Sequence, residues 1–125
     1  MIDMEFDEKL GVLRCISRGF TPMEEVEAFA RKAVVLQDVA RARHGRCLIL
    51  VDASDTGVQT QEAAGRLGEL SATRREPGDR TAIVIGSALA KLQSQRTAAK
   101  DGTGYFSTET EALAWLLDRD EAAKD

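Results

Sequence analysis

Two short apolar runs decide the fold: Arg46–Val51 (RCLILV) and Thr81–Ile85 (TAIVI). Each run is continuously aliphatic rather than alternating between apolar and polar residues. This pattern is typical of a strand that is buried on both faces at the centre of a parallel sheet. Parallel strands need crossover connections, so we expect helices before, between and after these two runs.

The preceding segment carries strong helix signals. Thr21, Pro22 and Glu24 predict a helix start, with Thr21 as the cap, Pro22 at the first helical position and Glu24 completing a capping box. We expect this helix to end near His44, with Gly45 as a left-handed stop. Its apolar face is expected to comprise Val26, Phe29, Ala30, Ala33, Val34, Leu36 and Ala40.

Three further helices are predicted after the first apolar run. They span Thr60 to about Arg75, Ser87–Ala99, and a last helix that begins after Thr108 with Glu111 in a second capping box. Asp52–Gly57 and the turn at 101–104 are expected to be irregular connections. The inner face of the last helix is expected to comprise Ala112, Leu113, Leu116 and Leu117.

The remaining strands are short. Met1–Phe6 alternates between apolar and polar residues, and Val12–Ser17 follows a polar turn that ends at Gly11, which predicts an antiparallel hairpin. Tyr105 and Phe106 form a last short strand. The chain is therefore predicted to be an α/β protein, with a hairpin followed by alternating helices and strands. The sheet should be mixed, mostly parallel and covered by four helices, in one domain over 1–125 with a charged, frayed tail at 118–125.

Composition excludes several functions. The 125 residues include 17 Lys and Arg against 21 Asp and Glu, so the net charge of −4 argues against a nucleic-acid or anionic-lipid surface. No apolar run approaches the ~20 residues of a membrane helix, and the acidic start does not resemble a secretory signal, so we expect a cytoplasmic protein without membrane insertion. Cys15 and Cys47 lie in apolar stretches and are expected as buried thiols. A single histidine, His44, excludes the usual zinc site, and no cofactor is expected.

Several segments together resemble a known family. They are Gly11–Leu13, Gly19–Glu25, Leu50–Asp52 and Phe106–Leu116, in that order. The set resembles the SpoIIAA-like branch of the STAS superfamily (sulfate transporter and anti-sigma-factor antagonist domains), over nearly the whole chain. The resemblance implies a mixed α/β fold, no cofactor, no chemistry of its own and action by docking to a partner protein.

The resemblance also implies a phosphorylation site. In the anti-sigma antagonists a serine at the start of the helix after the central strand is phosphorylated, within a motif like Asp-Ser-Ser-Gly. Here Asp55-Thr56-Gly57 is one residue shorter and lacks the second hydroxyl.

The best candidate site follows the first apolar run. Ligands of open parallel sheets bind beyond the carboxyl ends of the strands. Gly86 and Ser87 follow the second run, so they are expected at the same edge of the sheet as the loop after the first run. A phosphate on Ser54 or Thr56 would lie near a helix N-terminus, which favours negative charge. The alternative is that these residues only form a turn and caps. The candidate loop comprises Asp52, Ser54, Asp55, Thr56 and Gly57.

The outer side of the first helix is a second candidate. A narrow apolar stripe there could pack against a second copy or a partner, although scattered surface valines are also common. It comprises Ala28, Val35, Val39 and Ala42. The basic residues at the end of this helix either offset the helix dipole or form an anion-binding patch, and Trp115 is expected at the rim of the last helix. Those basic residues are Arg41, Arg43, His44 and Arg46.

These observations predict a non-catalytic regulatory domain that acts by protein–protein contact, as a homodimer, with an unidentified protein partner. The alternative is a module that holds a lipid or another apolar small molecule between a helix and the sheet. An enzyme that uses Asp52 and Asp55 is a third class, but no other residue converges on that pair, so no catalytic or metal-binding residue is expected.

Overall fold

The computed structural model describes residues 1–56, 62, 65–66, 78–86 and 102–118. In chain order the elements are β1 (Ile2–Asp7), β2 (Val12–Gly19), α1 (Met23–His44), β3 (Leu48–Thr56), β4 (Arg80–Val84), β5 (Thr103–Phe106) and α4 (Glu109–Leu116). The order of strands and helices follows the prediction wherever the structure describes the chain.

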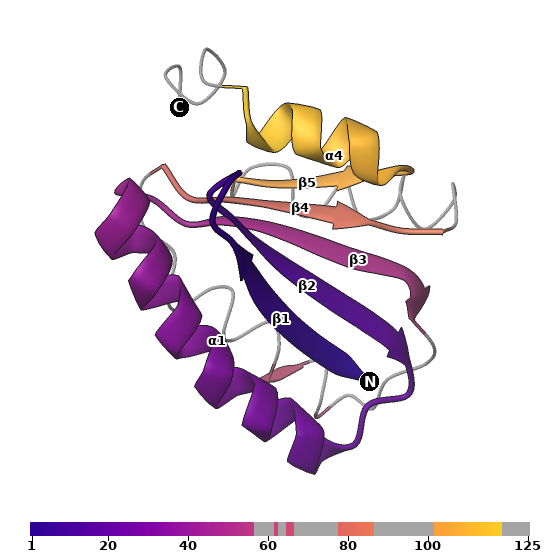
Figure 1. Ribbon diagram of the computed structural model, residues 1–125. Coiled ribbons are helices and arrows are strands. Elements are labelled where there is room, and N and C mark those ends of the chain that lie inside the picture. The colour runs from indigo at the N-terminus through magenta and orange to yellow at the C-terminus, as the bar shows by residue number, and fades with distance from the viewer. Residues whose placement is uncertain (57–61, 63–64, 67–77, 87–101, 119–125) are drawn as a thin grey trace.

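All five strands belong to one sheet, in the spatial order β1-β2-β3-β4-β5 (Figure 1). β1 pairs antiparallel with β2, and every later neighbour is parallel. The two apolar runs lie side by side as β3 and β4, with Leu50 opposite Ala82. The prediction of a mixed, mostly parallel sheet is confirmed.

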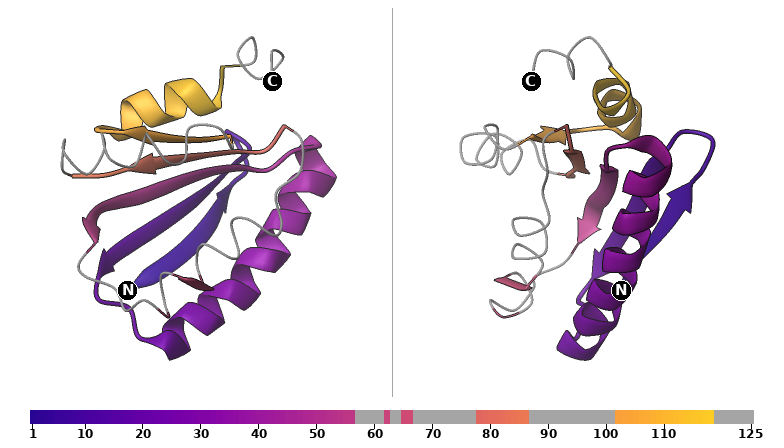
Figure 2. Two further views of the ribbon diagram at one scale, coloured as in Figure 1. Left: turned by 180° about the vertical axis from the view of Figure 1, so that it is seen from behind. Right: turned by 90° about the vertical axis from the view of Figure 1, so that its left-hand side faces the viewer.

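Helices α1 and α4 cover opposite faces of this sheet (Figure 2). Strand alternation sends neighbouring residues to different faces, so Leu13 packs toward α1 while Val12 packs toward α4. The α1 side buries Ile2, Met4, Leu13 and Cys15 against Phe29, Ala30, Ala33 and Ala40. The α4 side buries Val12, Leu48, Leu50, Ala82 and Val84 against Ala112 and Leu116. The α1 layer lies over the hairpin, and the α4 layer lies over β3, β4 and β5.

The start of α1 differs from the prediction. Pro22 is the N-cap, with extended backbone angles (φ −63°, ψ 153°), and no side chain caps the helix. Thr21 is instead buried, and its Oγ1 accepts a hydrogen bond of 3.1 Å from the amino group of Met1. The predicted Thr21–Glu24 capping box is therefore wrong, because a contact with a distant part of the chain occupies the hydroxyl.

The other helix termini follow local rules. Gly45 ends α1 with φ +76° and donates its N–H to Arg41, as predicted. Thr108 caps α4 by accepting the N–H of Glu111 at 3.2 Å, also as predicted. Leu117 was expected on the inner face, but it is 37% exposed because α4 ends one residue earlier.

Some predictions concern residues outside the described part of the chain. Of the helix expected from Thr60 to about Arg75, the structure describes residues 62, 65 and 66, all helical. Arg66 donates a hydrogen bond of 3.0 Å to Glu27, which attaches this segment to α1. The helix expected at 87–99 and the tail beyond Asp118 lie outside the described residues. Thr103 and Gly104, expected in a turn, belong to β5 because β4 supplies their strand partners.

Cys15 and Cys47 are both buried free thiols, which confirms that expectation. Burial raises the pKa of the Cys15 thiol to about 12. Neither helix in the described ranges combines the length and apolar character needed to cross a bilayer.

Candidate functional site

The candidate loop after the first apolar run is a continuation of the strand. Residues 52–56 belong to β3, so their prediction as an irregular turn is wrong, and Gly57 lies outside the described residues. The strand continues because β2 also extends past its predicted end. After a register irregularity between Ile16 and Arg18, Arg18 pairs with Asp55 and Gly19 pairs with Thr56.

The hydroxyl of Ser54 is already engaged. Ser54 Oγ donates to Asp52 Oδ1 at 2.6 Å, and the Ser54 amide reaches the same oxygen at 3.1 Å. Ser54 therefore lies in a strand beside a carboxylate, not at a helix N-terminus as the phosphorylation argument requires. A phosphate on Ser54 would be repelled by Asp52 and by the neighbouring Asp55.

The two predicted strand-end segments come together in the structure. Gly86, just past β4, lies so close to β3 that a Cβ on it would be 2.7 Å from the backbone oxygen of Ser54. Such a distance is too short for any larger residue, so glycine allows the ends of β3 and β4 to approach each other. Ser87 lies outside the described residues.

A third element contributes an aromatic ring at this end of the sheet. Phe20 follows the last residue of β2 and is 57% exposed. Gly19 pairs with Thr56, so Phe20 leaves β2 at the same end of the sheet as the exposed Ser54 and Asp55. We call Phe20, Ser54, Asp55 and Gly86 the strand-end corner. Sequence reasoning missed Phe20, although a large aromatic residue in a Gly-Phe-Thr-Pro connection was a usable signal.

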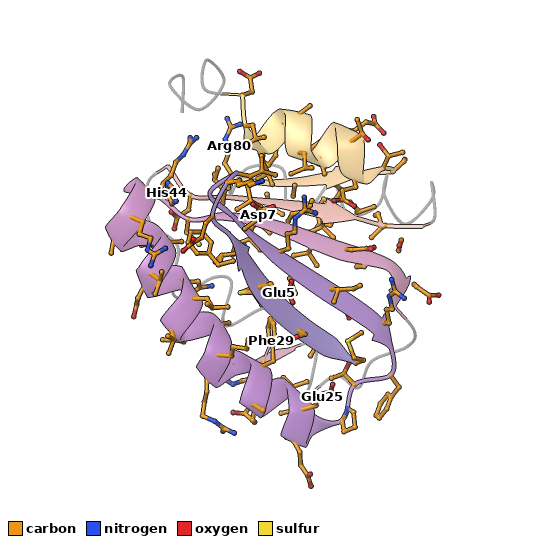
Figure 3. All side chains as sticks on the ribbon, viewed as in Figure 1. Glu5, Asp7, Glu25, Phe29, His44 and Arg80 are labelled. Carbon is orange, nitrogen blue, oxygen red and sulfur yellow. The ribbon has the colours of Figure 1, made fainter. Side chains whose placement is uncertain are left out.

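A second feature lies on the α4 side of the sheet. A groove of about 290 Å³ runs between the hairpin and the N-terminus of α4. Its lining comprises Asp3, Met4, Glu5, Arg14, Cys15, Ile16, Leu50, Asp52 and Glu109. Figure 3 labels Glu5 and Asp7 on β1. Sequence reasoning did not find this groove, because it depends on where the N-terminus of α4 lies relative to the hairpin.

Arg14 links the hairpin to α4 beside this groove. Its Nε contacts Asp7 Oδ2 at 3.3 Å, and its Nη1 hydrogen bonds to Glu109. The hydrogen bonds to Glu109 and Asp7 raise the pKa of the Arg14 guanidinium above its ordinary value. The hydrogen bond from the Leu10 amide makes the largest contribution to lowering the pKa of the Asp7 carboxyl, and the hydrogen bond from Arg14 lowers it further. In the described ranges no group of three or more acidic, histidine or cysteine side chains is arranged to hold a metal ion.

Comparison with known proteins addresses the fold. No family model matches the sequence, and no curated protein matches it. Among solved structures, the chain is similar to an uncharacterised protein of the DUF3478 family with a SpoIIAA-like fold from Shewanella loihica PV-4. The match has a TM-score of 0.65 and 19% sequence identity, and it covers 93% of this chain and 92% of that one. The chain has a SpoIIAA-like fold.

In this SpoIIAA-like fold the outer side of α1 faces away from the sheet. Ala28, Val35 and Ala42 are exposed, Val35 at 61%, whereas Val39 is half-buried. The stripe is therefore accessible along most of its length, as a contact surface requires.

The basic end of α1 is used within the fold. Arg41 Nη2 lies 2.6 Å from Asp79 Oδ2, and Arg43 hydrogen bonds to Glu8. The His44 ring packs edge-on against Phe6, with centroids 5.7 Å apart. These contacts attach the helix end to the hairpin and to the start of β4, so they favour a structural role over an anion-binding patch.

Trp115 packs at the rim of α4, as predicted. Its ring lies 5.5 Å from that of Phe106, and the Arg80 guanidinium stacks over it at 4.6 Å. Arg80 also donates a hydrogen bond of 2.9 Å to the Trp115 carbonyl, where the negative end of the α4 dipole lies.

Proposed function

We propose that this chain is a non-catalytic regulatory domain that acts by docking to a partner protein through the strand-end corner. The observation that carries the proposal is that Phe20, Ser54 and Asp55 are all exposed at the same end of the paired strands β2 and β3. The SpoIIAA-like fold supports it, since the STAS resemblance implies docking rather than chemistry.

The corner has the composition of an interface centre. Aromatic side chains account for a large share of binding energy at protein interfaces, particularly where polar groups surround them. The close approach of Gly86 to the Ser54 carbonyl joins β3 to the segment after β4. Ser54 and Asp55 lie on a strand, and Phe20 and Gly86 follow strand ends, which hold a contact surface in place better than a free loop does.

The geometry does not favour an enzyme. His44 packs against Phe6 and over Gly11, at the turn that precedes β2. Ser54 lies toward the other end of the sheet, because β2 and β3 run parallel from Val12 opposite Leu48. A serine nucleophile and its base must be within hydrogen-bond reach, and these two residues are not brought together.

The proposal is tested by affinity capture from cell extract, with the immobilised full chain as bait and mass spectrometry as the readout. We expect Phe20→Ala and Asp55→Ala to lose a protein that the unaltered chain captures. Leu10→Ala is the matched control, since Leu10 is 38% exposed but lies in the hairpin turn. Equal capture by all three variants would reject the corner as the docking surface.

The alternative of an apolar-ligand module is not supported by the groove. Several carboxylates line it, and an apolar ligand would remove water from them without providing hydrogen bonds. Native mass spectrometry of protein purified from cells separates the two functions. Additional bound mass would favour a ligand, whereas a clean protein mass would favour docking.

We also propose that the chain is one domain and that it forms a homodimer through the outer side of α1. Val35, which is 61% exposed, is the centre of that stripe. We expect Val35→Glu to convert a dimer to a monomer in light scattering coupled to size-exclusion chromatography. A wild-type monomer at all concentrations would contradict the dimer. The buried, unbridged Cys15 and Cys47 support a cytoplasmic location, where thiols stay reduced.

A further inference from the structure

The α4 side of the hairpin is a charged sheet surface that no described helix covers. Alternation along β1 places Ile2 and Met4 in the core beneath α1, so Asp3 and Glu5 lie on the opposite face. Figure 1 looks onto this face, and no helix lies in front of β1 or β2. Among the described elements, α4 covers β3, β4 and β5, and none covers this face of the hairpin.

The groove at this boundary combines an apolar floor with an acidic rim. Ile16 is half-buried and Leu50 is buried, and both line the groove. Asp3 pairs with Ile16 across the two strands, and Glu5 pairs with Arg14. The volume of about 290 Å³ is near the lower limit of ordinary ligand sites, so it suits a few side chains rather than a large cofactor.

The charges of the groove are unbalanced. Carboxylates outnumber cations four to one among its lining residues. The single cation of this lining, Arg14, is already held by Asp7 and Glu109. Lys32 reaches Asp3 at 2.7 Å from α1, whereas Glu5 makes no ion pair with any residue that the structure describes. The surface therefore presents uncompensated negative charge beside an apolar floor.

We propose that this groove docks a segment of a partner protein that carries lysine or arginine next to an aliphatic residue. The cationic groups face Glu5 and Asp52, and the aliphatic side chain lies on Ile16 and Leu50. Arg14 illustrates the chemistry, because its guanidinium is held between two carboxylates at the same surface. This inference rests on the proposed docking function and adds that the docking segment of the partner is positively charged.

The same charge argues against other occupants. Nucleic acid and anionic lipid would be repelled by the rim. A cationic segment of a different protein is the occupant that complements both the rim and the floor.

The test is fluorescence anisotropy with the full chain and a fluorescein-labelled amphipathic peptide of lysine, leucine and alanine. A peptide with glutamate at each lysine position is the charge control. We expect saturable binding of the lysine peptide only, and we expect it to weaken as ionic strength rises. Amide shifts in a nuclear magnetic resonance titration should be confined to β1, β2, the Leu50–Asp52 part of β3 and the N-terminus of α4.

Two double variants distinguish peptide binding in the groove from non-specific electrostatic attraction of the peptide to an acidic protein. Glu5→Gln with Asp52→Asn removes two charges from the groove, and we expect it to weaken binding about tenfold. Glu24→Gln with Glu62→Gln removes the same charge from exposed helical positions and should change affinity by less than about twofold. Glu5→Lys, at an exposed position, should abolish binding without unfolding the chain.

Three results would overturn the proposal. They are the absence of saturable binding, equal weakening by both double variants, and spermidine binding at the same amides as tightly as the peptide. The last would assign the groove to a free polyamine. If the peptide fails while Phe20→Ala still loses its captured partner, the groove proposal is wrong and the docking function stands. If the peptide binds but the corner variants capture normally, the corner is wrong and the groove stands.

Discussion

Removing the carboxylate of Asp79 should destabilise this protein more than removing the carboxylate of any other ion pair among the described residues. Asp79 joins three elements. Its Oδ2 lies 2.6 Å from Arg41 Nη2 on the last turn of α1, and its Oδ1 accepts the Cys47 amide at 2.8 Å, just before β3. Asp79 itself immediately precedes β4. We predict that Asp79→Ala loosens the junction of α1, β3 and β4.

The magnitude follows from burial. The side chains of Arg41 and Asp79 are only 18% and 9% exposed. Removing one partner of a buried ion pair costs about 3 to 5 kcal/mol, because the other charge is left in a poorly hydrated site. Arg41 retains some access to water, so we expect the lower value, about 3 kcal/mol. For a chain of this length that loss corresponds to a fall in melting temperature of roughly 10 °C.

The assay is urea denaturation followed by circular dichroism, together with a thermal melt. Glu8→Ala is the matched control, because Glu8 pairs with Arg43 on the same helical turn while the two side chains are 67% and 54% exposed. An exposed pair is worth about 0 to 1 kcal/mol. Asp79→Asn keeps an acceptor for the Cys47 amide and should fall between the two. If Asp79→Ala costs no more than Glu8→Ala, the role assigned to this buried pair is wrong.

Three other predictions follow from single observations. Gly86→Ala should cost about 1 to 3 kcal/mol in urea denaturation, because its Cβ would lie 2.7 Å from the Ser54 backbone oxygen, and an unchanged midpoint would contradict that packing. Cys15, whose pKa is raised to about 12 by burial, should not react with iodoacetamide at pH 8 in the native protein but should react in urea; rapid native labelling would show that the thiol is accessible. The hydrogen bond from Lys32 lowers the folded-state pKa of Asp3 below its unfolded value of 3.8, so its stabilisation is present above that pH and is lost as the pH falls through the folded-state pKa. Asp3→Asn should therefore reduce the loss of stability below about pH 4. If the free energy of unfolding of the variant falls with decreasing pH as steeply as that of the unaltered chain, the contribution assigned to Asp3 is wrong.

The strand-end corner was only partly predictable. Ser54, Asp55 and Gly86 were singled out because they follow apolar runs, and the structure does bring Ser54 and Gly86 together. Their backbone conformation was predicted wrongly, since polar residues with turn propensity continue β3 when a neighbouring strand supplies hydrogen bonds. The Gly-Phe-Thr-Pro connection could have pointed to Phe20, but the placement of β2 and α1 was needed to show that its side chain is 57% exposed.

The sequence by itself determined the central sheet, the end of α1 at Gly45 and the capped start of α4 at Thr108. These features depend on apolar patterning and on contacts within a few residues, which local sequence specifies directly. Only the tertiary structure decided that Thr21 contacts Met1, that Arg41 pairs with Asp79, and that Asp3 and Glu5 share one exposed face of the hairpin. Each of these depends on residues far apart in the chain, whose distances are set when the helices pack on the sheet.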